Sequence, residues 1–235
     1  MSKRIMSLIM GLIIATSLIG CGGNGSKDSK SQGKANVSAE ESKTEDNEDS
    51  DLEGTWAENY TLEQTKGFYK EYLKKMEDIT KGFGLKYEKD EKIREENDQK
   101  VNDDFIYYDN EKPEANKIES MYFGMKTYGD NLEKGDISLK LSLNFDGESA
   151  IKNNDFDLGK TAFDSYIKAF TGKESIDYSK INKEIIDGLK EGKTEVDINN
   201  TIDGLKEEII ATKDCIIYKL STKKYTFADA EMSME

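Results

Sequence analysis

Hydrophobic and polar residues alternate most regularly between residues 137 and 145. Apolar side chains occupy every second position there, namely Ile137, Leu139, Leu141, Leu143 and Phe145. Successive side chains of a strand point to opposite faces of its sheet, so this pattern predicts a strand with one dry face and one wet face. A similar alternation predicts a second strand over 120–126, with methionine and phenylalanine at the dry positions.

A different spacing, of three and four residues, runs from Leu62 to Phe83. It predicts a helix with one apolar face, and residues 61–64 have the composition of a capping box at its start. The same spacing predicts two further helices, over 162–170 and 181–189. Residues 86–104 are rich in charge and show neither pattern, so we expect a solvated loop or a marginal helix there.

Further short strands are expected at 104–109, 194–199, 206–212, 215–221 and, pairing at an edge, 224–229. The expected order is helix, three strands, two helices, and three or four strands. Short connections favour antiparallel pairing, so we predict an α+β domain with an antiparallel sheet of about six to seven strands and about three helices.

The folded domain is expected to span residues 54–235. Its layout suggests two similar halves, about 54–150 and 151–235, because a helical part precedes a run of strands in each. No sequence repeat at a fixed offset supports a duplication, which stays a hypothesis.

Residues 21–53 contain almost no large apolar side chains and are rich in Gly, Ser, Lys, Asp and Glu. Such a segment cannot bury enough surface to offset the entropy of ordering, so we predict a disordered acidic tether. Residues 49–54 resemble the start of a calcium-binding loop. However, Glu53 and Tyr60 stand where that loop needs Asp or Asn and a bidentate Glu, so an acidic linker is the favoured interpretation.

The first twenty residues combine a positively charged start with an apolar stretch over 5–15. This stretch is shorter than the about 20 apolar residues of a membrane span, and it is typical of a secretory signal peptide. The segment ends in the sequence Leu18, Ile19, Gly20, Cys21. These four residues resemble the lipobox of bacterial lipoproteins. The resemblance implies cleavage after Gly20, so that residues 1–20 are removed, and attachment of a lipid to Cys21.

We therefore expect the membrane to be a partner through acyl chains on Cys21, with the chain on the outer face of the cell membrane. The abundant Lys, Ile and Asn are typical of a low-GC Gram-positive bacterium, by association only. A lipidated Cys21 has no thiol left for a disulfide. Cys215, in an apolar run, is then expected to be a small buried residue, with a reactive thiol as the minor alternative.

The chain has 235 residues, a net charge of −14, no histidine, and arginine only at Arg4 and Arg94. Without histidine it cannot form Ser-His-Asp or Cys-His catalytic sites or a histidine-containing zinc site. An acidic chain with so few arginines is poorly suited to nucleic acids. We expect no nucleic-acid partner, no cofactor and no metal site. The many carboxylates leave hydrolysis by a pair of acids open.

The wet face of the strand at 120–126 carries the candidate binding surface. Tyr122, Lys126 and Tyr128 share this face, which suits contact with a protein, peptide or glycan. The alternatives are that helices cover this face too, or that the tyrosines are ordinary strand formers.

These observations favour an extracytoplasmic lipoprotein that is a non-catalytic binding or accessory protein of the cell envelope. One alternative is a carboxylate-based cell-wall hydrolase. Another is a small-ligand or ion receptor for a transporter, for which the folded part is short.

Overall fold

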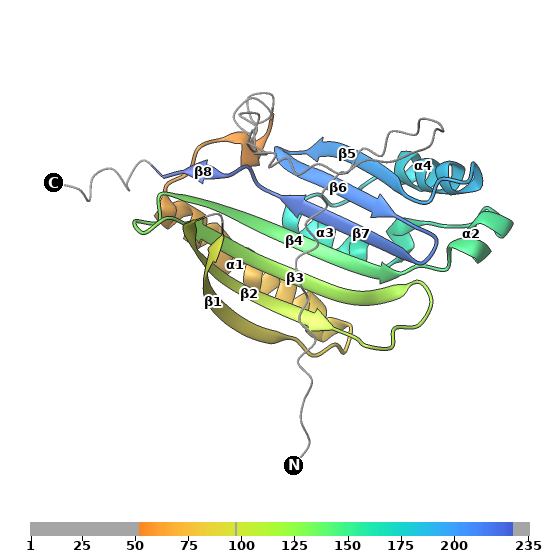
Figure 1. Cartoon of the computed structure of the whole chain (residues 1–235), viewed down its shortest axis with the longest axis horizontal. Helices are drawn as coiled ribbons and strands as arrows, with labels where there is room; N and C mark the ends of the chain where they lie inside the picture. Colours follow the sequence, from red (N-terminus) through yellow and green to blue (C-terminus); the bar gives the residue numbers. More distant parts are fainter. Residues whose placement is uncertain (1–51, 97, 228–235) are drawn as a thin grey trace, which may run out of the picture. The chain divides into compact units, whose positions relative to one another are not determined.

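The computed structural model describes residues 52–96 and 98–227. They form an open antiparallel sheet of eight strands with four α-helices, so the predicted α+β class is confirmed in outline (Figure 1). The helices are α1 (Leu62–Gly82), α2 (Gly147–Asn153), α3 (Phe163–Thr171) and α4 (Ser179–Lys190), with 3-10 turns η1 (Thr55–Ala57) and η2 (Leu158–Lys160). The strands are β1 (Glu88–Glu96), β2 (Gln99–Asp109), β3 (Lys117–Tyr128), β4 (Lys134–Asn144), β5 (Val196–Ile202), β6 (Leu205–Ala211), β7 (Cys215–Ser221) and β8 (Tyr225–Thr226).

The strands follow the order β1-β2-β3-β4-β7-β6-β5, and β8 pairs with β4. Residues 138–144 of β4 pair with residues 215–221 of β7, so the first and second parts of the chain meet at the middle of the sheet. The described part has one strand more before the central helices, and one central helix more, than the sequence predicts. The suggested halves therefore meet along β4 and β7, and their duplication stays a hypothesis.

Helix α1 begins where the sequence predicts. The Thr61 hydroxyl accepts a hydrogen bond from the Gln64 N–H at 3.2 Å, and Gln64 Oε1 accepts one from the Thr61 N–H at 2.9 Å. This reciprocal pair is the predicted capping box. The apolar side of α1 lies against the sheet, where the ring of Tyr69 stacks on that of Phe123 at 5.8 Å between centroids.

Residues 86–104 are neither the loop nor the marginal helix that their charge predicts. They form β1 and the first half of β2, a hairpin whose register runs from Glu88–Tyr107 to Glu96–Gln99. The side chains of β1 are exposed or half-buried on both faces, so no alternation marks the strand in the sequence. Charged side chains along such an edge also discourage pairing with another chain.

Helix α2 follows β4 at a point where the sequence predicts only a turn. Asp146 caps this helix, because its Oδ1 accepts a hydrogen bond from the Ser149 N–H at 3.1 Å. Seven residues contain too few apolar side chains to show a period of 3.6, which is why the pattern misses it.

The other predicted elements are present with shifted ends. The helices expected at 162–170 and 181–189 are α3 and α4, and the strands expected after them are β5, β6 and β7. The piece expected at 224–229 contributes only β8, which pairs with β4 next to the end of β7 instead of at an outer edge. Residues 228–229 lie outside the described part.

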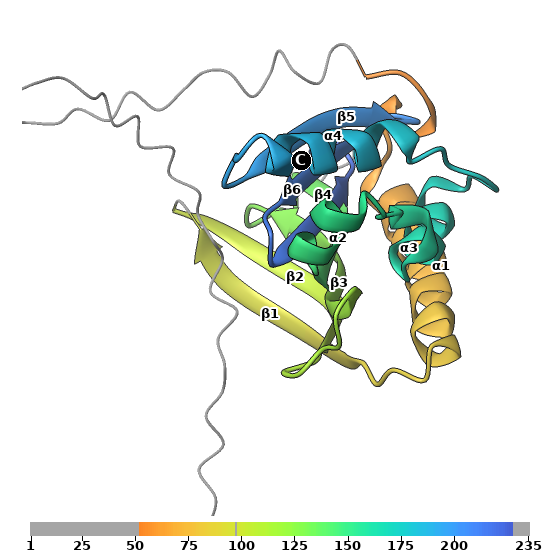
Figure 2. The same ribbon diagram turned by 90° about the vertical axis from the view of Figure 1, so that its right-hand side faces the viewer.

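One face of the sheet is covered by helices, and Figure 2 shows α1 and α3 together on that side. The alternating apolar residues of β4, from Ile137 to Leu143, are at most 1% exposed. The ring of Phe123 meets that of Phe170 in α3 at 5.4 Å, and Phe163 meets Tyr218 of β7 at 6.1 Å. The dry face that the sequence predicts is therefore the core of the domain.

The start of the described chain is fastened to two distant segments. The N–H of Trp56 donates to the Asp203 carbonyl at 3.1 Å, and the Tyr225 hydroxyl donates to the Trp56 carbonyl at 3.0 Å. The Trp56 ring is buried 5.3 Å from the ring of Phe170. A Cβ at Gly204, in the turn between β5 and β6, would lie 2.5 Å from the backbone after Trp56, so this close approach requires glycine.

Candidate binding face of the sheet

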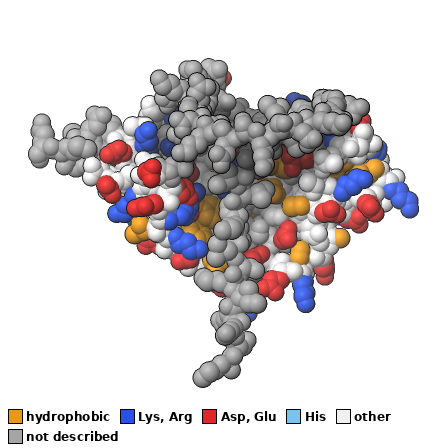
Figure 3. All heavy atoms as spheres, in the orientation of Figure 1, with side chains coloured by type: hydrophobic (Ala, Val, Ile, Leu, Met, Phe, Trp, Pro, Cys, Tyr) orange, Lys and Arg blue, Asp and Glu red, His pale blue; other side chains and the backbone are white. Residues whose placement is uncertain are grey.

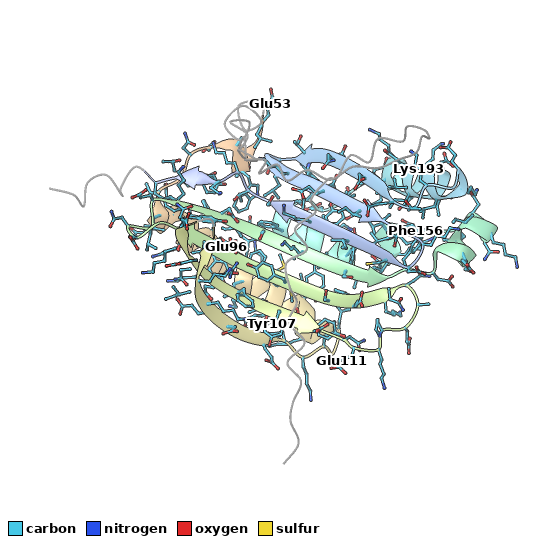
Figure 4. All side chains as sticks on the ribbon, viewed as in Figure 1. Glu53, Glu96, Tyr107, Glu111, Phe156 and Lys193 are labelled. Carbon is cyan, nitrogen blue, oxygen red and sulfur yellow. The ribbon has the colours of Figure 1, made fainter. Side chains whose placement is uncertain are left out.

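The second face of the sheet carries no helix within the described part of the chain (Figures 1 and 2). We call it the open face. Its central residues follow from the strand register: Arg94, Asp103, Phe105, Tyr107, Tyr122, Lys126, Tyr128, Asp136, Ser138, Lys140, Ser142, Cys215, Lys219 and Ser221. Acidic, basic and apolar side chains are mixed on this side (Figure 3). Glu96 and Tyr107 mark its β1–β2 end (Figure 4).

The three residues that the sequence selects, Tyr122, Lys126 and Tyr128, all lie on the open face and are half-buried. Among the described residues, the alternative that helices cover this face does not hold. The site is therefore a broad surface of a sheet, built from side chains that alternate with the core.

A buried carboxylate organises one side of this surface. Asp103 of β2 is 4% exposed, and its two oxygens accept hydrogen bonds from the Tyr122 hydroxyl at 2.6 Å and from Arg94 Nη1 at 2.9 Å. Arg94 Nε also donates to Glu96 at 2.6 Å. Burial and the negative Asp103 raise the pKa of Tyr122, so this hydroxyl stays a neutral donor. A single arginine thus holds two carboxylates.

A second tyrosine–carboxylate pair lies along β3 and β4. The Tyr128 hydroxyl donates to Asp136 at 2.7 Å, and Lys224 Nζ lies 4.4 Å from the centroid of the Tyr128 ring. Burial raises the pKa of Asp136 by more than the Tyr128 hydrogen bond and Lys126 lower it. Both candidate tyrosines are therefore fixed by carboxylates of their own chain.

The aromatic rings of the open face are held close to the sheet. A Cβ at Gly124 would lie 2.4 Å from the Tyr122 hydroxyl oxygen, so the glycine makes room for this side chain. The ring of Phe105 lies 5.2 Å from that of Tyr122, and the Tyr107 hydroxyl donates to Glu88 at 2.7 Å. Because these rings are already ordered, the protein would lose little side-chain conformational entropy when a partner binds to them.

Two lysines at the centre of the open face have no such partner. Within the described part of the chain, neither Lys126 nor Lys140 has an ion pair or a hydrogen bond. Lys140 stands directly opposite Lys219 on β7, an arrangement of like charges that destabilises a sheet. Burial and the positive charges of Lys126 and Lys219 lower the pKa of Lys140.

Cys215 is not the small buried core residue that its apolar run predicts. It is half-buried on the open face, because the register of β7 gives the core positions to Ile216 and its alternating neighbours. Its Sγ lies 3.5 Å from the Ser142 hydroxyl, which donates to Glu119 at 2.8 Å. Burial raises the pKa of the Cys215 thiol and so lowers its thiolate fraction.

The acidic residues of the described part do not gather into a metal site, since no group of three or more metal-ligating side chains occurs there. Among those same residues, no helix combines the length and the apolar character that a membrane span requires.

A separate hollow of about 480 Å³ lies among η2, α3 and α4. Asp157, Asp164 and Asp177 line it together with Lys168, which pairs with Asp164 at 2.8 Å. Burial and the nearby Asp164 raise the pKa of Tyr178, another residue of its wall. Asp157 also pairs with Lys160 at 3.6 Å, so Asp177 is the one carboxylate of this wall without an ion pair to a described residue. The net charge of the wall still favours a small cationic ligand over an anion.

Leu18, Ile19, Gly20 and Cys21, which resemble a lipobox, lie outside the described residues, as does the predicted tether up to residue 51. Arg94 and Asp103 were not predicted as site residues, because the charge-rich segment around them shows no pattern that pairs them. Asp136 and Lys140 were not predicted as site residues either. Lys140 is at a wet position of the alternation over 137–145, and continuing that alternation by one residue would also place Asp136 on the wet face.

A comparison with protein-family models, with curated proteins and with solved structures found no match for this chain. The function proposed below therefore rests on the chain's own residues.

Proposed function

We propose that this protein is an extracytoplasmic lipoprotein that binds another macromolecule through the open face and has no catalytic activity of its own. The observation that carries the proposal is the open face itself, a sheet surface without a covering helix among the described residues. On this face two tyrosines donate hydrogen bonds to carboxylates, to the buried Asp103 and to the half-buried Asp136. Ordered aromatic rings beside charged groups are typical of protein interaction surfaces.

The carboxylates of the open face favour binding over hydrolysis. A glycoside hydrolase needs one carboxyl to protonate the leaving group and another to act as base or nucleophile. Asp103 is held by Arg94 and Tyr122, and Asp136 is held by Tyr128. These contacts give both groups a structural role and leave neither directed at an open pocket.

The proposed anchor rests on the sequence Leu18-Ile19-Gly20-Cys21 alone. Labelling of cells with radioactive palmitate tests it. We expect label on the wild-type chain and none on Cys21→Ala, because the thiol is the attachment point. Equal labelling of both chains would contradict the anchor without affecting the proposal for the open face.

Site-specific photo-crosslinking in intact cells tests the binding function. A benzoylphenylalanine at Tyr107, on the open face, should give discrete crosslinked products. The same group at the exposed Lys66, on the outer side of α1, should not give them. Identical products from both positions, or none from Tyr107, would overturn the proposal.

A small-ligand receptor is the second candidate, because the hollow between α3 and α4 falls in the size range of ligand sites, roughly 300–1,000 Å³. Its lining favours a cation, and Asp164→Asn would be expected to abolish binding there. The open face would be unaffected by that change, so the two candidates are separable.

A further inference from the structure

The centre of the open face has small residues at neighbouring positions of β3, β4 and β7. The register aligns Gly124 with Ser138 and Ser138 with Ser221. The Tyr122 side chain covers Gly124, so the small residues of this row that remain uncovered by Tyr122 are the two serines. We call Ser138 and Ser221 the floor of this central region. Lys126 lies on one side of this row along the strands, and Lys140 with Lys219 on the other.

The hydroxyls of this floor have no partner. Ser138 is 5% exposed and Ser221 is 8% exposed, yet neither hydroxyl makes a hydrogen bond to another described residue. Neither hydroxyl is among the fully buried atoms of the described part that lack a partner, which are Asn102 Oδ1 and the Tyr178 hydroxyl oxygen, so both remain accessible from solvent. The two hydroxyls are therefore free to donate hydrogen bonds to a ligand on this face. Both side chains point to the open face, since their neighbours in sequence face the core.

The neighbouring charges indicate which kind of ligand group would fit. Asp103 and Glu208 are the carboxylates whose charges act on Lys140. Both already have ion pairs, Asp103 with Arg94 at 2.9 Å and Glu208 with Lys219 at 2.8 Å. Neither Lys126 nor Lys140 makes an ion pair with a described residue. The register places Lys126 opposite Asp103 and Asp136, but each of these carboxylates is hydrogen-bonded to a tyrosine. Ammonium groups and serine hydroxyls are all donors to a negative oxygen.

The surrounding carboxylates limit the form of the anion. Glu96 and Asp136 lie within the electrostatic reach of Lys126, and Glu208 lies beside Lys219. An anionic polymer with a negative charge at every repeat would place some of its charges beside these carboxylates and be repelled by them. A protein surface of mixed charge that presents one acidic side chain between neutral and basic residues would be complementary.

We propose that the row Ser138–Ser221, flanked by Lys126 and Lys140, is a subsite for the carboxylate of one Asp or Glu side chain of a protein partner. The subsite rests on the proposed function of the open face and assigns its partner chemistry. The carboxylate accepts hydrogen bonds from the serine hydroxyls and neutralises the two lysines. It also offsets the repulsion between Lys140 and Lys219; Lys219 is paired with Glu208, whereas Lys140 has no ion pair with a described residue.

Lysine side-chain NMR tests this assignment on the full chain, labelled with ¹³C at lysine Cε and solubilised in a non-ionic detergent. At constant ionic strength, N-acetyl-glutamate should shift the Lys126 and Lys140 signals to saturation and raise the pH midpoint of Lys140. The uncharged N-acetyl-glutamine should leave both signals in place. Ser138→Ala and Lys140→Gln should each weaken binding about tenfold, because each removes a charge-assisted hydrogen bond.

Lys92→Gln is the matched control, because Lys92 lies on the same face but at the edge, 3.3 Å from Asp90. It should leave the dissociation constant for N-acetyl-glutamate unchanged. Lys140→Gln should also keep or raise the melting temperature, since it removes a repelled charge, whereas a purely structural lysine would lower it.

Equal shifts with N-acetyl-glutamine, or no shift with either probe, would overturn the subsite. Tighter binding of dimethyl phosphate than of N-acetyl-glutamate would overturn the protein carboxylate in favour of a phosphodiester. If crosslinking from Tyr107 succeeds while the NMR titration fails, only the subsite is wrong. If both fail, the binding function of the open face is wrong as well.

Discussion

The two faces of the sheet use alternate residues of the same strands in opposite ways. On the covered face, Leu139 and Phe123 are fully buried between β-strands and helices. On the open face, their neighbour Lys140 is exposed and Tyr122 is half-buried, and Tyr122 is held by a long-range hydrogen bond to Asp103. One strand can therefore supply stability with one set of residues and recognition with the other.

The faces also differ in how their interactions depend on conditions. Burial of apolar surface acts in proportion to area and depends little on pH. The open face depends on charged partners such as Arg94, Asp103 and Asp136, whose contributions change when one member is removed or titrated. The predictions that follow compare substitutions from the two faces.

The largest effect is expected on the covered face. Leu141→Ala should lower the free energy of unfolding by roughly 2–5 kcal/mol, because a fully buried leucine leaves a cavity. Denaturant titration measures the change. Lys140→Gln, one residue earlier on the same strand, should cost nothing at neutral pH. A comparable loss in both variants would show that the open face is also part of the core.

An intermediate effect is expected at the ion pair of the open face. Arg94→Gln should cost about 1–3 kcal/mol, since it leaves the nearly buried carboxylate of Asp103 without its cation. Tyr122→Phe removes only the hydroxyl bonded to Asp103 and should cost about 1 kcal/mol. If Arg94→Gln costs less than about 0.5 kcal/mol, the pair behaves as an exposed one and does not organise this face.

The smallest effect is expected from the titration of Asp136. Its pKa is raised in the folded chain, so the folded state holds a proton that the unfolded state has already released. Stability must then fall as pH rises from the ordinary pKa of an Asp, about 3.9, through the raised value. Asp136→Asn should remove this decline and stabilise the protein at pH 7, because the amide has no charge to desolvate.

Urea unfolding of the wild type and Asp136→Asn between about pH 4 and about pH 8 measures this difference. Asp109→Asn, at an exposed position of the same face, is the control and should follow the wild type. Parallel curves for the wild type and Asp136→Asn would show that the folded chain does not perturb this carboxyl.

The covered face was largely predictable from the sequence, and the open face only in part. Burial imposes a strict period on residues 137–143 and on α1, so their elements could be read directly. The positions of Tyr122, Lys126 and Tyr128 follow from the same alternation. Their partners do not, because the Arg94–Asp103 contact depends on the register of a hairpin whose charged edge strand carries no periodic pattern.

Cys215 is a second residue whose position depends on strand register and could not be predicted from local sequence. An apolar run predicts burial, but whether a given residue of a strand faces the core depends on register, and a shift of one residue exchanges the two faces. Ile216, Tyr218 and Leu220 occupy the core, so Cys215 faces outward beside Ser142. Local composition could not distinguish these two arrangements.

The fastening of Trp56 has a mechanical consequence. If Cys21 is anchored as proposed, any pull between membrane and partner enters the domain just before Trp56. The load would pass through the backbone hydrogen bond to Asp203 and the Tyr225 hydroxyl into the β5–β6 turn and β8, and through the Trp56 ring into Phe68 and Tyr72 of α1. The contacts of Trp56 would then share a pulling force among α1, α3, the β5–β6 turn and β8, so that no single strand of the open face bears it alone.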